Sequence, residues 1–142
     1  MKSINILFTA AGFRGYLIEY FKSELNGNGN VFVTNSIEPC SGFIHAKKSF
    51  LVPNSSDRSY IPKIIEICKK CNINFIISLH DIDTYYISKS KKIFDEIKVK
   101  LIMPRFEIVN QCLDKKKYIK FTNFKNLFLP IGSTNKNKIL EM

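Results

Sequence analysis

Apolar and polar residues follow one another along residues 3–34 in a way that predicts a strand, a helix and a second strand. The first strand, 3–9, is a short apolar run, and the helix, 16–25, repeats apolar residues at helical spacing. A stretch of alternating Asn and Gly then ends the helix, and a second apolar run follows at 31–34. A strand, a helix and a strand in this order form a βαβ unit, which has two parallel strands and a right-handed crossover.

The same alternation of short apolar runs and helical patterns continues to about residue 112. Further strands are expected at 49–52, 74–79 and 99–103, and further helices at 60–71, 84–97 and 104–112. The run 74–79 is apolar throughout, as in a parallel strand that helices cover on both faces. The segment 35–48 is expected to be irregular. The whole pattern predicts the α/β class, with a Rossmann-like doubly wound parallel sheet of about five strands.

The remainder of the chain has a different pattern. A basic helix is expected at 114–124, and another helix begins at about residue 135 without reaching an end signal within the sequence. We therefore expect residues 1–112 to form one Rossmann-like domain, and residues 113–142 to be the start of a second, incomplete domain.

The chain is large enough for one domain with a real core, but its charge is unusual. It has 142 residues, of which 45% are hydrophobic, and this composition excludes a disordered chain. The formal net charge of +10 suggests nucleic acid or an anionic surface as a partner. However, only three of the 22 cationic residues are Arg, which is the residue that best reads phosphates and guanine edges.

The excess of positive charge lies mainly in the last third of the chain. Residues 98–142 hold ten Lys and Arg against three Asp and Glu, a net charge of +7, whereas residues 1–97 have a net charge of +3. The run Asp114-Lys115-Lys116-Lys117 is by itself also typical of a solvated helix face. The charge alone therefore leaves both a solvated helix face and an anionic partner open.

Neither a membrane span nor a secretion signal is evident in the sequence. No apolar run approaches the roughly 20 residues that a membrane helix needs. Residues 1–3 lead directly into a strand-like run, without a signal-peptide pattern. We therefore expect a cytoplasmic protein with free cysteines and no membrane partner.

Two of the four cysteines, Cys68 and Cys71, are three positions apart within the expected helix 60–71. A structural zinc site needs four ligands, and Cys40 and Cys112 are isolated from this pair and from each other. A redox pair of the thioredoxin type begins a helix rather than ending one. We interpret the cysteines as packing residues, and we expect no metal site.

The turn after the first strand, Ala10-x-Gly12-x-x-Gly15, is a G-x-G-x-x-G fingerprint whose first Gly is replaced by Ala. Such a turn lets a ligand approach the backbone and places an anion at the N-terminus of the next helix, where Arg14 adds a positive charge. A tight turn without a ligand explains the pattern equally well. A dinucleotide site would also have an acidic residue at the end of the second strand, where this chain has Asn35.

A second polar group, His80, Asp81 and Asp83, follows directly after the expected strand 74–79. Ligands bind at this edge of open α/β sheets, and these side chains could exchange protons or hold a cation. The alternative is that the two carboxylates cap the next helix. We consider a binding edge a better interpretation than a catalytic centre.

The chain resembles the N-terminal, pre-ATP-grasp domain of carbamoyl-phosphate-synthase-large-subunit-like ATP-grasp proteins. The resemblance extends from residue 1 to about residue 130 and rests on the order and spacing of the runs INILFTAAGFRGYLIEYF, KSFLVP, EICKK, INFIISLHDID and CLDKKKYIKF. It implies an ATP-dependent ligase, which activates a carboxylate as an acyl phosphate that an amine then attacks. Small carboxylate and amine substrates, and ATP with Mg²⁺ in the complete protein, are implied as well. With this resemblance, we interpret the positive charge of residues 98–142 as part of a phosphate-facing surface between two domains, and we do not expect nucleic acid to be a partner.

The resemblance also implies roles for individual residues. By its match to the Asp-Lys pair of the family, Lys115 would contact ATP. No catalytic residue and no metal ligand is expected in this chain. The substrate-binding residues, facing a cleft between domains, would be Thr9, Ala11, Gly12, Arg14, Asn35, Ser36, His80, Asp81 and Asp83. The second strand commonly ends in Asp in this family, so Asn35 is a departure from the pattern.

The most important departure from the family is length. The rest of the ATP site would lie beyond Met142, so we expect this chain alone to be inactive, with a missing ATP-grasp domain or a partner chain supplying the remainder. Two other interpretations stay open. One is a stand-alone Rossmann-like binder of a nucleotide or dinucleotide, and the other is a basic module that binds nucleic acid. The sequence also leaves a homo-oligomer open.

Overall fold

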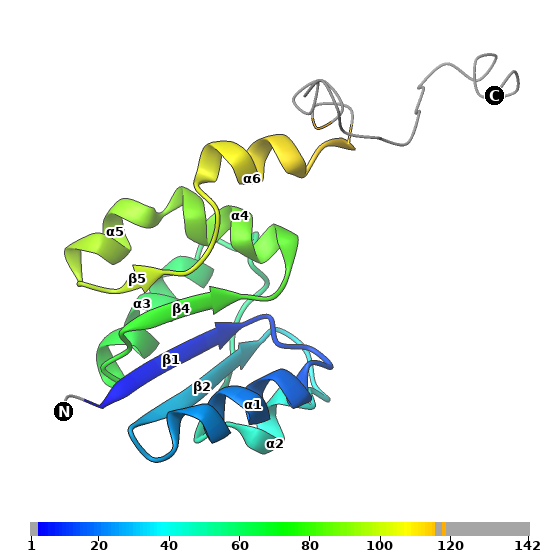
Figure 1. The fold of residues 1–142 in the computed structure, drawn as a ribbon. Coiled ribbons are helices and arrows are strands. Elements are labelled where there is room, and N and C mark those ends of the chain that lie inside the picture. Colours follow the sequence, from blue (N-terminus) through cyan, green and yellow to red (C-terminus); the bar gives the residue numbers. More distant parts are fainter. Residues whose placement is uncertain (1–2, 116–117, 119–142) are drawn as a thin grey trace, which may run out of the picture. The chain divides into compact units, whose positions relative to one another are not determined.

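The computed structural model describes residues 3–115 and residue 118 (Figure 1). Its centre is a five-stranded, wholly parallel sheet with the strand order β3-β2-β1-β4-β5. The strands are β1 (Ile4–Thr9), β2 (Gly29–Asn35), β3 (Lys48–Leu51), β4 (Phe75–Ser78) and β5 (Lys100–Leu101). The helices are α1 (Gly15–Leu25), α2 (Gly42–His45), α3 (Tyr60–Lys70), α4 (Asp81–Lys89), α5 (Lys91–Glu96) and α6 (Phe106–Cys112).

This topology confirms the Rossmann-like doubly wound sheet that the sequence predicts. The strand order runs outward from β1 to β3 in one direction and from β4 to β5 in the other, so it reverses between β1 and β4. The chain divides into two compact units, Met1–Asn110 and Gln111–Met142, and the whole sheet belongs to the first. The expected helix at 114–124 lies almost entirely outside the described residues, and the one from residue 135 lies wholly outside them.

The two faces of the sheet carry separate cores because successive side chains of a strand point to opposite sides. In β1, Leu7 packs into the core on the face that α3, α4 and α5 cover, whereas Ile6 and Phe8 pack into the core on the face of α1 and α2. Leu7 and Phe8 are both completely buried. This burial on both sides explains why the strand reads as a continuous apolar run.

Two elements differ from the sequence prediction. The single helix expected at 84–97 is two helices: α4 begins earlier, at Asp81, and ends at Lys89, and Ser90 is both the residue that follows α4 and the residue that precedes α5. The segment expected to be irregular contains the short helix α2, whose Gly42 lies against the side chain of Ala11. A Cβ at Gly42 would stand 2.9 Å from the Cβ of Ala11. A helix of one turn has too few residues to show a helical period.

The turn after β1 contains two residues in the left-handed region. Ala10 has a φ of 51° and Gly12 a φ of 50°. Ala10 therefore adopts the conformation that glycine takes without strain, at the position where the fingerprint has its first Gly. The Cβ of Ala10 makes this turn less stable than the same turn with glycine.

The four cysteines are free, and they differ in their environment. Cys68 is buried in the core beneath α3, and burial raises the pKa of its thiol from 9.0 to about 12. Cys71 is half-buried, and burial raises the pKa of its thiol as well. Residues 3–115 and 118 contain no group of His, Cys, Asp and Glu that could hold a metal ion.

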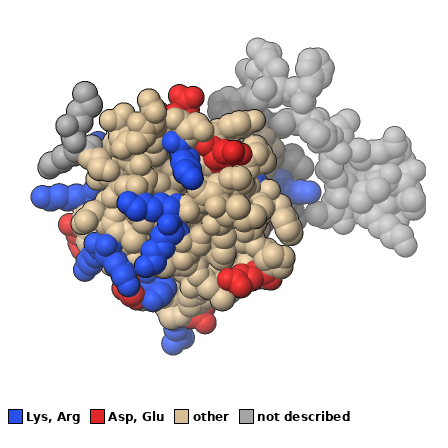
Figure 2. Space-filling view, turned by 90° about the horizontal axis from the view of Figure 1, so that it is seen from below, with Lys and Arg blue, Asp and Glu red and all other residues tan. Residues whose placement is uncertain are grey.

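The surface of the described unit is unevenly charged. On the face shown in Figure 2, Lys and Arg side chains gather in one region, and acidic side chains lie nearer the outline of the molecule. None of the helices in the described part of the chain is both long and apolar enough to span a bilayer.

Replacing Ala10 with Gly is expected to stabilise the protein. The substitution removes the strain of a Cβ at positive φ, which exceeds the added backbone entropy, so the free energy of unfolding should rise by about 0.5–1 kcal/mol. Urea unfolding of the variant and the wild type measures this difference. The matched control is Ala11→Gly, which removes a fully buried methyl group and should lower the free energy of unfolding by about 1 kcal/mol. A destabilised Ala10→Gly variant would contradict the strain argument.

The buried thiol of Cys68 is expected to make stability depend on alkaline pH. Its folded-state pKa lies above its ordinary value, so its contribution is fully present below pH 9 and is lost as the pH rises toward 12. Between pH 8 and pH 10 the wild type should lose about 1 kcal/mol more of its free energy of unfolding than Cys68→Ala. Urea unfolding at the two pH values provides the test. Cys112→Ala, at an exposed position, should behave like the wild type.

Candidate functional site

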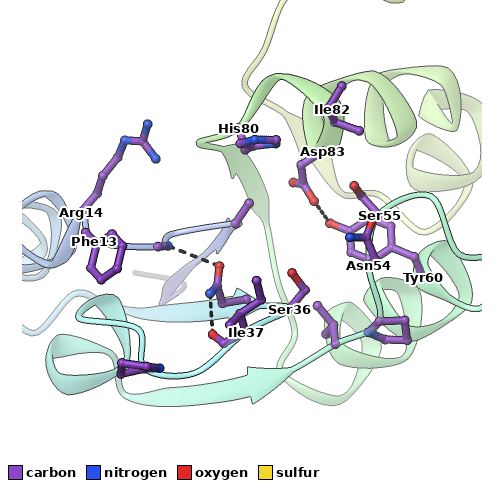
Figure 3. A pocket seen from close by; sticks show the side chains of 16 residues that line it. Phe13, Arg14, Ser36, Ile37, Asn54, Ser55, Tyr60, His80, Ile82 and Asp83 are labelled. Carbon is purple, nitrogen blue, oxygen red and sulfur yellow. Dashed lines mark hydrogen bonds between the residues drawn. The ribbon is translucent and has the colours of Figure 1, made fainter.

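A cleft of about 780 Å³ lies at the carboxyl edge of the sheet (Figure 3). Its walls come from the segments that follow four neighbouring strands, namely 10–14 after β1, 35–39 after β2, 52–60 after β3 and 80–83 after β4. The strand order reverses here between β1 and β4, and this is the place where open α/β sheets bind ligands. The volume lies within the range of small-molecule sites, about 300–1,000 Å³.

The turn after β1 is held by bonds within the chain. The N–H of Gly12 donates to Oδ1 of Asn35 at 3.3 Å, and the N–H of Gly15 donates to Oγ of Ser41 at 3.1 Å. The N–H of Arg14 donates to the carbonyl of Ala11 at 3.0 Å. These donors would have to cradle a phosphate in a dinucleotide site, and internal acceptors already occupy them. The geometry therefore favours a tight turn over a phosphate-binding turn.

Asn35 connects the turns after β1 and β2. Its Oδ1 accepts the Gly12 bond, while its Nδ2 donates to the carbonyl oxygen of Ile37 at 2.7 Å. Both polar atoms of the amide are thus used within the protein. This residue shapes the wall of the cleft where a dinucleotide site would have a ribose-binding acid.

Arg14 supplies a positive charge at one end of the cleft. Its side chain is exposed and extends away from the turn, and the neighbouring Phe13 is 83% exposed (Figure 3). Among the described residues Arg14 takes part in none of the ion pairs, which join Lys63 with Glu66, Lys91 with Asp95 and His45 with Glu19. A ligand anion could therefore use it without breaking an existing pair.

Asp83 supplies a negative charge at the other end of the cleft (Figure 3). Its carboxylate accepts hydrogen bonds from three hydroxyl groups, those of Thr9 in β1, Tyr60 in α3 and Ser78 in β4. The Ser78 bond measures 2.8 Å. We call these four residues the Asp83 cluster. The cluster joins four elements of the fold, because Asp83 itself lies in the first turn of α4.

The environment of Tyr60 keeps its hydroxyl protonated. The side chain is 1% exposed, and burial raises the pKa of the phenol strongly, with the nearby negative charge of Asp83 adding to the effect. The phenol therefore stays protonated, and remains a hydrogen-bond donor to Asp83, at neutral pH and above the ordinary pKa of a tyrosine. The arrangement excludes the alternative in which Asp83 caps α4, because α4 has no side-chain capping bond at its start.

Six of the nine residues expected to bind substrate line the cleft, and three do not. The six lining residues are Gly12, Arg14, Asn35, Ser36, His80 and Asp83. Thr9 and Ala11 are completely buried, Thr9 against Asp83 and Ala11 against α2. Asp81 is exposed and lies outside the lining. Lys115 is exposed and belongs to the second compact unit.

The sequence prediction missed the segment after β3. Asn54, Ser55 and Tyr60 line the cleft, and Tyr60 binds Asp83 directly. In the sequence, the residues around Ser55 indicate helix caps and Tyr60 indicates the start of a helix. These structural roles explain the residues without a ligand, so the sequence gives no reason to expect them at a binding site. The available signal was topological: a third parallel strand brings its carboxyl end to the same edge of the sheet as the other strands.

Solved structures that share the fold of this chain include a ligase and a synthetase. The chain is similar to an L-amino acid ligase from Bacillus licheniformis, with a TM-score of 0.70, 14% identity and coverage of 92% of this chain and 32% of that one. It is also similar to an N5-carboxyaminoimidazole synthetase from Staphylococcus aureus, solved with ADP, with a TM-score of 0.65, 16% identity and coverage of 99% and 36%. The chain thus spans about a third of the length of these proteins.

The sequence itself gives a more specific match. No curated protein matches the chain at a significant level. The family model described as the PylC-like N-terminal domain matches residues 6–102, which contain all five strands of the sheet except the first two residues of β1. This match covers more than half of the chain. The chain therefore belongs to the PylC-like N-terminal domain family, and the resemblance to the pre-ATP-grasp domain of ATP-grasp proteins is confirmed.

Proposed function

We propose that this chain is the N-terminal domain of an ATP-dependent carboxylate–amine ligase that works through an acyl phosphate. The observation that carries the proposal is the cleft at the reversal point of the sheet, in a chain of this family. The names of two structural relatives, an L-amino acid ligase and a synthetase complexed with ADP, support the same class of reaction. In this proposal the cleft holds a small substrate, and Arg14 attracts the carboxylate.

In this proposal, ATP and Mg²⁺ bind mainly outside the sheet unit. The described residues contain no group of metal-ligating side chains, and the backbone donors of the turn after β1 are occupied. We therefore assign the nucleotide and its metal ion to the rest of the protein, in an ATP-grasp domain that follows this one or in a partner chain. Lys115, in the second compact unit, would be this chain's contact with ATP. The role of the sheet unit is to bind and orient the substrate.

The 142-residue chain alone is expected to release no ADP from ATP. A longer protein that includes the coding sequence after codon 142 should release ADP only when a carboxylate and an amine are both present. A coupled assay for ADP, run over a panel of amino acids, measures this. Tight ATP binding or ADP release by the 142-residue chain would contradict the division of labour proposed here.

Arg14 and Lys115 are expected to affect different substrates in the active, longer protein. Arg14→Gln removes the cation of the cleft and should raise the KM for the carboxylate about tenfold or more, with little change in the KM for ATP. Lys115→Met should do the reverse. Steady-state kinetics with each substrate varied in turn separates the two effects. Lys69→Met, at an exposed position of α3, is the control and should leave both values unchanged. Equal effects of Arg14→Gln on both KM values would contradict the assignment.

A further inference from the structure

Asp83 is the only charged side chain that is buried among the described residues. It is 4% exposed, and the other buried polar residues in this part of the chain are Thr9, Thr34 and Ser88. The ion pairs of the described residues do not include Asp83. Its carboxylate nevertheless lines the cleft, so a ligand in the cleft can reach it.

The three hydroxyl groups of the Asp83 cluster supply hydrogen bonds but no positive charge. A buried carboxylate is ordinarily paired with a cation, because hydrogen bonds from neutral groups only partly replace its hydration. If the cluster served only to join the four elements, a neutral amide could do so at a lower cost of desolvation. The first turn of α4 adds the partial positive charge of its helix dipole, but no side chain among the described residues supplies a full positive charge to this carboxylate at the wall of the cleft.

The same end of the cleft has spare capacity to accept hydrogen bonds. Tyr60 lines the cleft and donates its proton to Asp83, and its oxygen has two lone pairs, only one of which the nearby Thr9 hydroxyl can use. Beneath the cluster, the hydroxyl of Thr34 has no hydrogen-bond partner among the described residues, although it is completely buried. Thr34 follows Val33, which pairs in register with Phe8, so Thr34 and Thr9 point to the same face of the sheet. Thr34 itself does not line the cleft, so the acceptors that a ligand can reach at this end are the Asp83 carboxylate and the Tyr60 oxygen.

We propose that Asp83 is the anchor for a protonated amine, and that the cleft therefore selects ligands that carry an ammonium group at this end. An ammonium group supplies the missing positive charge and three N–H donors for the carboxylate and the Tyr60 oxygen. A metal ion fits less well, because the described residues offer no group of three metal ligands around Asp83. This inference rests on the proposed function and names the chemical class of its substrate.

The anchored amine is not the attacking nucleophile in this scheme. The lone pair of an ammonium nitrogen is bonded to a proton, so an amine held as a cation on Asp83 is a recognition group. The substrate of the cleft is accordingly a carboxylate that also bears an amino group. Arg14 lies at the opposite end of the cleft (Figure 3), and the apolar side chains of Phe13, Ile37 and Ile82 line the space around these charges.

The test measures how the 142-residue chain binds three probes of similar length at pH 7. The probes are 5-aminopentanoate, pentan-1-amine and pentanoate, and the measurement is titration followed by ¹H–¹⁵N chemical shifts. We expect both probes with an ammonium group to bind at least about tenfold more tightly than pentanoate, corresponding to one charged hydrogen bond. The amide shifts should centre on Ser78, Tyr60 and Asp83. Equal binding of all three probes, or shifts elsewhere, would overturn the proposal.

Three variants separate recognition of charge from a structural role. Asp83→Asn should abolish the preference for ammonium probes. Asp81→Asn, which removes an exposed carboxylate two residues away on the same helix, should keep it. Tyr60→Phe removes one acceptor for the ammonium group but leaves the charge, so it should reduce the preference without abolishing it. A folded Asp83→Asn protein with the wild-type preference would refute the anchor. If Asp83→Asn does not fold, the probe series on the wild type and on Tyr60→Phe still decides.

These outcomes are independent of the test of the proposed function. The binding experiment needs neither ATP nor the rest of the protein. A longer protein that releases ADP, combined with no preference for ammonium probes, refutes only the anchor. A preference for ammonium probes without ADP release in the longer protein refutes only the ligase.

Discussion

Burial of β1 on both faces is the constraint on which the rest of the structure depends. Leu7 and Phe8 are fully buried toward opposite faces, so both sides of the sheet must be covered. Helices cover both sides here because the strands next to β1 run parallel to it, and a parallel connection has to cross over one face of the sheet. The chain leaves β1 toward β2 first and returns to β4 on its other side. At the carboxyl edge, the connection that leaves β1 leads to α1 on one face of the sheet, and the connection that leaves β4 leads to α4 on the other. The cleft is the space that they leave between them.

The sequence predicts the fold well because the signals for a doubly wound sheet are strong and local. Continuous apolar runs and helical periods place every strand and the helices α1 and α3. The break at Ser90 has no comparable signal, since neither Gly nor Pro lies there. The helix α2 depends on a contact between Gly42 and Ala11 that is distant in sequence. A pattern of neighbouring residues in the sequence cannot reveal a contact between two residues that lie far apart in it.

The site is predictable only in part, for a related reason. Sequence position identifies residues that immediately follow a strand, such as Arg14 and His80, and these do line the cleft. Whether a side chain such as Thr9 points into the cleft or into the core depends on the parity of its position in the strand and on its partners. The Asp83 cluster joins residues up to 74 positions apart, so no spacing within the sequence reveals it.

Asn35 has a consequence for how this scaffold can change. An amide both donates and accepts, and Asn35 uses the two functions on two different loops. A carboxylate in its place could still accept from Gly12, but it would face the carbonyl oxygen of Ile37 with no proton to share. In this chain an acid at the end of β2 would thus push the second loop away from the first. The present position of the loop after β2 is therefore incompatible with a ribose-binding acid at residue 35. A site that binds a nucleotide ribose here would need both the acid and a different conformation of the loop that contains Ile37.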